Sequence, residues 1–209
     1  MKPRTSNVLS KIAARAKRGD VEVEHLLVVV KLGDPSAAPV LRELSATHDW
    51  PMKKRGFVPL GMWVECIATL LTRGAGAVAR GVKTKKLDGD VALGLLEEDS
   101  DAASMRACIA IARDPALTRA ALEAIFTIAR HTRGIDPRTA SRARKLAHRF
   151  LRKARRDVDR SAAYVVLERL GDESSLALMA SMPPERKTSP FAGMREDAIA
   201  TLRRRLQRR

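Results

Sequence analysis

Apolar side chains recur every three or four residues along most of this chain, the spacing that places them on one face of an α-helix. Glycines, prolines and short charged stretches divide the pattern into segments. These segments predict twelve helices, at residues 5–18, 20–32, 35–46, 58–73, 76–86, 89–98, 101–113, 115–132, 137–156, 159–170, 173–182 and 194–208. Two connectors, 47–57 and 183–193, are too rich in Pro, Gly and charge to be helical throughout. The pattern therefore predicts an all-α protein without a β-sheet.

One part of the pattern occurs twice. The stretch KLGDPSAAPVLREL at residues 31–44 returns as RLGDESSLALMASM at residues 169–182. Five positions correspond at a constant offset of 138 residues: Leu32 with Leu170, Gly33 with Gly171, Asp34 with Asp172, Leu41 with Met179 and Leu44 with Met182. Each copy predicts a helix, a Gly-Asp corner and a second helix, because Gly tolerates left-handed backbone angles and Asp caps the next helix. Pro35 then suits the first position of that helix.

Further corners of this kind lie at Asp114-Pro115, 80 residues after Asp34-Pro35, and at Asp136-Pro137. This series of helix, tight corner and helix resembles the HEAT and HEAT-like repeat family of α-solenoids, whose unit of about 40 residues fits the 80-residue interval twice. The 58 residues from Asp114 to Asp172 fit no whole number of repeats. We therefore expect irregular central repeats with unusually long helices.

The resemblance implies a single α-solenoid domain over residues 1–209, a superhelix of stacked antiparallel helical hairpins. Its best-supported repeats span 20–182, the connector 183–193 follows, and a basic C-terminal helix occupies 194–209. Composition agrees with this fold, because the chain is 45% hydrophobic but only 3% aromatic, and Ala, Leu and Val suit closely stacked helices. Leu41 and Met179 are then expected at equivalent buried positions.

No apolar run approaches the roughly 20 residues of a membrane span, and the basic start lacks the apolar stretch of a signal peptide. We therefore expect no membrane partner and a cytoplasmic location. The two cysteines, Cys66 and Cys108, fit a reducing compartment. We expect Cys66, which shares a helical face with Trp63 and Leu70, to be a small buried hydrophobe.

The residue types that carry catalysis form no recognisable motif. The four histidines show neither the i, i+4 pairing of a helical zinc site nor a neighbouring cysteine pair. The stretch RGAGAVARG at 73–81 contains Gly-x-Gly, but no strand precedes it and no Lys-Ser/Thr follows, which argues against a phosphate loop. We expect no metal, no cofactor and no catalytic residue.

Charge is distributed unevenly along the chain. The formal net charge is +16, and residues 131–160 alone hold eleven Lys/Arg against three Asp/Glu. Within this segment Ala140, Ala143, Ala147, Phe150 and Ala154 form one apolar helical stripe. A second stripe holds the predicted anion-binding residues Arg138, Arg142, Lys145, Arg149, Arg152 and Arg156. The stripes are centred roughly 160° apart, so the apolar one should pack and the cationic one should face away.

Two interpretations of the cationic stripe remain open. Arg donates two parallel hydrogen bonds to phosphate, and six like charges at this spacing repel one another unless an anion relieves them. A genome rich in G and C can also favour Arg and Ala without selection for binding, and a charge run is often a solvated face. Such a bias alone does not separate Arg from Ala by helical phase, which favours anion binding.

The connector at 47–57 is a possible secondary contact. Its Trp50 is one of seven aromatics in the chain, and Lys53, Lys54 and Arg55 follow it. Aromatic rings interleaved with cations can stack on bases or grip a peptide. The alternative is a loop anchored to the core by its Trp.

Three functions follow from these features. The first is a non-catalytic solenoid that binds the nucleic-acid backbone without sequence specificity, and the second is a scaffold for an acidic protein. The third is enzymatic, since HEAT-like folds include DNA glycosylases for alkylated bases and phycobilin lyases. The glycosylase site resembles a pocket of several aromatics around a catalytic Asp, and Trp50, Trp63 and Tyr164 have no recognisable motif partner here. We therefore assign no catalytic residue.

Overall fold

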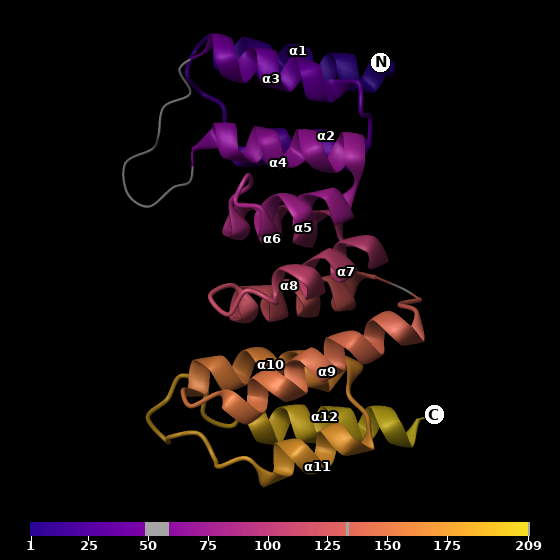
Figure 1. Cartoon of the computed structure of the whole chain (residues 1–209), viewed down its shortest axis with the longest axis vertical. Helices are drawn as coiled ribbons and strands as arrows, with labels where there is room; N and C mark the ends of the chain where they lie inside the picture. The colour runs from indigo at the N-terminus through magenta and orange to yellow at the C-terminus, as the bar shows by residue number, and fades with distance from the viewer. Residues whose placement is uncertain (49–58, 133, 209) are drawn as a thin grey trace. The chain divides into compact units, whose positions relative to one another are not determined.

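The computed structural model of the protein describes residues 1–48, 59–132 and 134–208 (Figure 1). These residues form twelve helices and no strand, which confirms the all-α prediction. The first six are α1 (Pro3–Ala16), α2 (Val23–Leu32), α3 (Ala37–Thr47), α4 (Leu60–Arg73), α5 (Ala75–Lys83) and α6 (Gly89–Asp99). The others are α7 (Ala102–Ile111), α8 (Thr118–His131), α9 (Pro137–Lys153), α10 (Asp157–Leu170), α11 (Glu173–Ser181) and α12 (Met194–Gln207). All twelve correspond to predicted helices.

The chain divides into two compact units, residues 1–99 and 100–209. In its described residues, each unit holds six helices and buries its own set of apolar side chains. The first unit contains α1 to α6 and the second contains α7 to α12. A single solenoid domain across both units stays a prediction.

In the first unit, α1 packs on α2 and α3 packs on α4, while α1 lies beside α3 and α2 beside α4 (Figure 1). Helices α5 and α6 pack on each other and on α4. The centre of this unit holds fully buried side chains from four helices, among them Leu26, Leu41, Ile67 and Leu95. Branched aliphatic side chains thus join the helices into one core.

In the second unit, consecutive helices pack in pairs, α7 with α8, α9 with α10, and α11 with α12. The first helices of the pairs contact one another in order, α7 with α9 and α9 with α11, and so do the second helices, α8 with α10 and α10 with α12. The core contains Met105, Leu122, Ile125, Ile128 and Leu151, all fully buried. This unit is therefore two rows of helices closed around one apolar layer.

The two Gly-Asp corners have different geometry. Gly33 ends α2 in the left-handed conformation with φ of 59°, as the sequence predicted. Gly171 ends α10 in an extended conformation, so the same expectation is wrong there. Its small size is needed instead, because a Cβ at Gly171 would lie 2.2 Å from the carbonyl oxygen of Leu167 and 2.9 Å from the Leu202 side chain. Gly33 is therefore needed for its left-handed backbone conformation, whereas Gly171 is needed because neighbouring atoms leave no room for a side chain.

The Asp residues of the predicted corners also fall into two classes. Asp34 and Asp114 each accept a hydrogen bond from the backbone N–H two residues later, at 3.1 and 3.0 Å, and the next helix begins only after that turn. Pro35 therefore precedes α3 rather than opening it, contrary to the prediction. Asp136 and Asp172 are true N-caps, which accept from the N–H three residues later at 2.8 and 3.1 Å.

A third N-cap of this kind, Asp101, was not among the predicted corners. Its carboxylate accepts from the backbone N–H of Ser104 at 2.6 Å at the start of α7. Asp101, Asp136 and Asp172 follow one another at intervals of 35 and 36 residues, and they begin α7, α9 and α11. Asp114 instead lies between α7 and α8, the two helices of one pair, whereas Asp172 lies between one pair and the next. The 58-residue interval between them therefore does not measure a repeat.

The burial expected for one echoed pair of apolar residues is confirmed. Leu41 and Met179 are both fully buried. Leu41 lies on α3 and Met179 on α11, each seven residues after the Asp of its corner. The corners join one packed pair of helices to the next, because α3 packs on α4 and α11 packs on α12.

Candidate nucleic-acid interface

The basic segment forms α9, which Asp136 caps and Pro137 opens, as predicted. Pro suits this first position because its fixed φ is helical and its missing N–H would have had no partner within the helix. The helix ends at Lys153, three residues before the predicted end, and Ala154 is extended. Seventeen residues make α9 the longest helix in the described parts of the chain.

The apolar face of α9 is wider than the predicted alanine stripe. Ala143 and Ala147 are fully buried, as expected. Ala140 and Phe150 keep part of their surface exposed, and Ala154 lies beyond the helix. Leu146 and Leu151 supply much of the packing instead, because α9 contacts α7, α8, α10 and α11 and therefore buries a broader arc than one narrow stripe.

The opposite side of α9 carries the five predicted cations of this helix, all exposed, which we term the α9 basic face: Arg138, Arg142, Lys145, Arg149 and Arg152. Lys153, the last residue of α9, is exposed beside them. Fourteen residue steps separate Arg138 from Arg152, and at a rise of about 1.5 Å per step the basic face is about 21 Å long. Among the residues that the structure describes, no carboxylate forms an ion pair with any of the five. Their positive charge is therefore available to an external anion.

The sixth predicted residue, Arg156, does not belong to this helix. It lies at the N-cap position of α10 and donates two hydrogen bonds to Asp159, from Nε at 2.7 Å and from Nη2 at 2.9 Å. The hydrogen bonds and charge of Asp159 raise the pKa of the Arg156 guanidinium above its ordinary value. Arg156 is exposed like the others, but its charge is already balanced within the protein.

Two further polar residues of α9 fix the helix in the second unit. Arg144 forms an ion pair with Asp172, with 3.1 Å between Nε and Oδ2, and donates to the carbonyl oxygen of Leu170 at 3.4 Å. The Nε2 of His148 lies 2.8 Å from the hydroxyl of Ser175, and burial lowers the pKa of His148. The first contact joins α9 to the corner before α11 and the second joins it to the first turn of α11, so both fix the helix that carries the basic face.

The secondary contact predicted at Trp50, Lys53, Lys54 and Arg55 lies outside the described residues. Of the other aromatics considered for an enzymatic pocket, Tyr164 is fully buried and Trp63 is half-buried on α4. Burial raises the pKa of the Tyr164 hydroxyl to about 12.

Sequence reasoning missed one group of cations, in the first unit. Arg73 and Arg80 belong to the stretch 73–81, which lacks a phosphate-loop motif, and the structure places them at the end of α4 and on α5 around a groove. Their spacing of seven residues would place them on one side of a continuous helix, but Gly74, with φ of 74°, separates the two helices. Because of this turn, the spacing of Arg73 and Arg80 along the sequence did not reveal that both line one groove.

In the part of the chain that the structure describes, no three His, Cys, Asp or Glu residues gather in a way that could hold a metal ion. None of the described helices combines the length and the apolar character that crossing a bilayer requires. No family model, no curated protein and no solved structure matches this chain.

Proposed function

We propose that the protein is a non-catalytic, HEAT-like binding module of the cytoplasm that engages the phosphate backbone of nucleic acid without sequence specificity. The observation that carries the proposal is the α9 basic face, with five exposed cations on one side of a helix whose other side is buried. The proposal needs no cofactor and assigns no catalytic residue.

The pairing of helices supports the HEAT-like part of the proposal. In the second unit three consecutive helix pairs stack with like helices in contact, and an Asp N-cap opens each pair. The interval of 35 and 36 residues is somewhat shorter than the family's unit of about 40. Repeating units of this kind typically present a continuous surface for extended partners.

The chemistry of the α9 basic face supports a phosphate partner. Four of the five residues are Arg, whose planar fork donates two parallel hydrogen bonds to phosphate oxygens. Like charges at i, i+3 and i+4 repel one another, and a polyanion along the helix would relieve that repulsion. The length of about 21 Å matches roughly six base-pair steps of duplex at 3.4 Å per step.

Readout of bases requires side chains that reach base edges or stack on bases. The α9 basic face presents cations only, and the one aromatic of α9, Phe150, is half-buried on the other side of the helix. The proposed interaction is therefore electrostatic and independent of sequence. It should weaken steeply as salt concentration rises, because bound cations release counterions from the strand.

Fluorescence anisotropy with an unrelated duplex and an unrelated single strand, over about 50 to 200 mM salt, tests the proposal. The test variant is Arg142→Gln, Arg149→Gln and Arg152→Gln together. The matched control is Arg113→Gln, Lys187→Gln and Arg203→Gln, which removes the same charge from scattered exposed positions of the second unit. We expect the test variant to bind both nucleic acids more weakly than the control and with a smaller salt slope.

Equal binding by test variant and control would show that net charge alone drives the interaction. No binding by the wild type at low salt would contradict the proposal and leave an acidic protein as the partner to seek. A protein partner that competes with neither duplex nor single strand would favour that alternative.

A further inference from the structure

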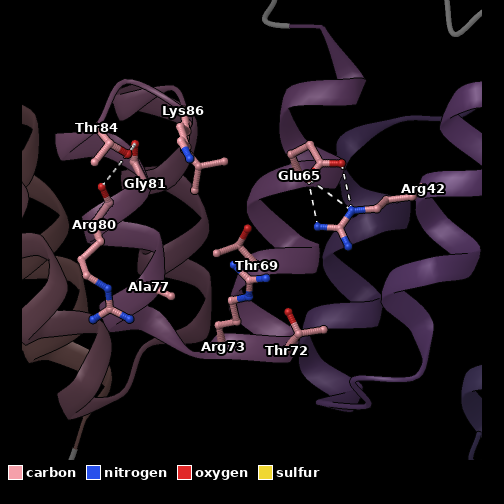
Figure 2. Close-up of a pocket in the computed structure, with 11 residues that line it drawn as sticks. Arg42, Glu65, Thr69, Thr72, Arg73, Ala77, Arg80, Gly81, Thr84 and Lys86 are labelled. Atoms are coloured by element: carbon pink, nitrogen blue, oxygen red, sulfur yellow. Dashed lines mark hydrogen bonds and ion pairs between the residues drawn. The ribbon is translucent and has the colours of Figure 1, made fainter.

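The first unit contains a groove of about 380 Å³ between α3, α4 and α5 (Figure 2). We term it the α4–α5 groove. Its α4 wall presents Glu65, Thr69 and Arg73 at intervals of four residues, which places them on one side of the helix. Arg80 of α5 and Lys86, which follows that helix, line the other side. These residues have no role in the α9 basic face.

One pair of charges in the groove is already satisfied. Arg42 of α3 donates to the Glu65 carboxylate from Nε and Nη2, each at 3.0 Å, and Figure 2 shows this pair at one edge of the group. A bidentate pair of this kind fixes both side chains and cancels their charges. The pair therefore contributes little net charge to the groove.

Three cations remain in excess. Arg73, Arg80 and Lys86 line the groove and are exposed, and none of the carboxylates in the described residues forms an ion pair with them. Three positive charges around one concave surface repel one another and attract a multiply charged anion. The groove therefore has a net charge that the protein itself does not balance.

The local backbone places these cations around one space. Gly74 adopts φ of 74° and turns the chain directly from α4 into α5, so Arg73 and Arg80 come from successive helices. The chain then folds back on Gly81, whose carbonyl accepts from the backbone N–H groups of Lys86 at 2.9 Å and Leu87 at 3.2 Å. A Cβ at Gly81 would lie 2.6 Å from the Leu87 side chain, which would have to shift, so glycine suits the close turn that brings Lys86 to the groove.

A hollow of about 330 Å³ in the second unit provides a contrast. It is also lined by three arginines, but each of them is bonded within the protein. Arg144 pairs with Asp172, Arg169 donates to the carbonyl oxygen of Ala129 at 3.3 Å, and Arg205 donates to that of Gly171 at 2.5 Å. Those arginines hold helices together, whereas the three cations of the α4–α5 groove have no such partners within residues 1–48, 59–132 and 134–208.

We propose that the α4–α5 groove is a second, independent anion site that binds adjacent phosphate groups through Arg73, Arg80 and Lys86. The Arg guanidinium groups can donate paired hydrogen bonds to the oxygens of one phosphate, and the Lys ammonium group can form an ion pair with a second phosphate. Among the residues that the structure describes, few apolar side chains and no aromatic ring line the groove, so the ligand is recognised by its charge. Two sources share this chemistry, a free polyphosphate and consecutive phosphates of a nucleic-acid strand. The site goes beyond the proposed function and does not depend on α9.

Isothermal titration calorimetry with inorganic tripolyphosphate tests the site in the full-length protein. The groove variant is Arg73→Gln with Arg80→Gln, and the matched control is Arg4→Gln with Lys11→Gln, which removes two exposed cations from α1 of the same unit. Loss of charge-assisted hydrogen bonds should weaken tripolyphosphate binding about tenfold or more in the groove variant. The control should bind like the wild type. Thermal melts establish that each variant is folded.

A single-stranded oligonucleotide identifies the source of the phosphates. It is titrated into the protein that carries Arg142→Gln, Arg149→Gln and Arg152→Gln, with and without the groove substitutions. Loss of the residual oligonucleotide binding on adding the groove substitutions supports strand phosphates, and loss of tripolyphosphate binding alone supports a free polyphosphate. Tripolyphosphate affinity that is unchanged in the groove variant, or reduced equally in the α1 control, overturns the site whatever the α9 variants show.

Discussion

Arg160 and Asp157 form an ion pair inside the second unit, with 2.6 Å between Nη2 and Oδ1. The two side chains expose only 9% and 12% of their surface. Arg160 also donates from Nη1 to the carbonyl oxygen of Pro183 at 3.2 Å, and Asp157 accepts from the backbone N–H of Arg186 at 3.2 Å. One buried pair at the start of α10 thus holds the non-helical connector that leads to α12.

Replacing Arg160 by Met should destabilise the protein by about 3 kcal/mol or more, because it leaves the Asp157 carboxylate buried without its partner. The matched control is Arg156→Met, four residues before Arg160. It breaks the ion pair between Arg156 and Asp159, in which the Arg side chain is 73% exposed. Exposed pairs contribute little, so the control should change the free energy of unfolding only slightly. Urea denaturation of both variants measures the difference. Similar losses in the two variants would contradict a special role for the buried pair.

The two neighbouring apolar residues of α9 should respond differently to truncation. Leu151 is fully buried, so Leu151→Ala should cost about 2–5 kcal/mol through lost burial and the cavity left behind. Phe150 keeps part of its ring exposed, so Phe150→Ala should cost less, about 1–2 kcal/mol. Thermal melts of both variants test this order. A larger loss at Phe150 would mean that α9 is rotated from its position here.

The two corner glycines provide a third comparison. Gly171→Ala should be strongly destabilising, because the new methyl group would meet the backbone oxygen of Leu167 at 2.2 Å and neither can move without distorting α10. Gly33→Ala meets no atom within 4 Å and should cost only the left-handed strain, about 1 kcal/mol. Chemical denaturation of the pair would distinguish the two causes. Equal losses would show that the corners have the same geometry.

Much of the fold could be predicted because helical spacing is a local property. All twelve helices appear where apolar spacing placed them, and Asp136-Pro137 opens α9 as its chemistry requires. The tertiary partners could not be predicted in this way. Gly171 looks identical to Gly33 in the sequence, yet a Cβ there would meet both the Leu167 carbonyl oxygen at the end of its own helix and the side chain of Leu202, which lies more than thirty residues away along the chain.

The candidate site shows the same division. The separation of cations from alanines along α9 follows from helical geometry, and the five residues of the α9 basic face are indeed exposed. The early end of the helix at Lys153 does not follow from spacing, because Ala154 and Arg155 continue the same composition. The next helix begins at Asp157, which places Arg156 at its N-cap position, where Arg156 donates hydrogen bonds to Asp159.

Single substitutions should separate the residues that bind phosphate from those that do not. Arg149 is exposed on α9 without an ion pair in the described structure, so Arg149→Gln should reduce the slope of log affinity against log salt by about 0.9 for a duplex, one phosphate contact. Arg156 has the same charge and is also exposed, but Asp159 already holds its guanidinium through two hydrogen bonds. Arg156→Gln should therefore leave the slope nearly unchanged, although both variants lose one positive charge.

Anisotropy titrations of the two variants against the same duplex, at matched salt concentrations, make the comparison. If the two substitutions reduce the slope equally, binding follows net charge rather than the α9 basic face, and the assignment of these five residues to the interface is wrong.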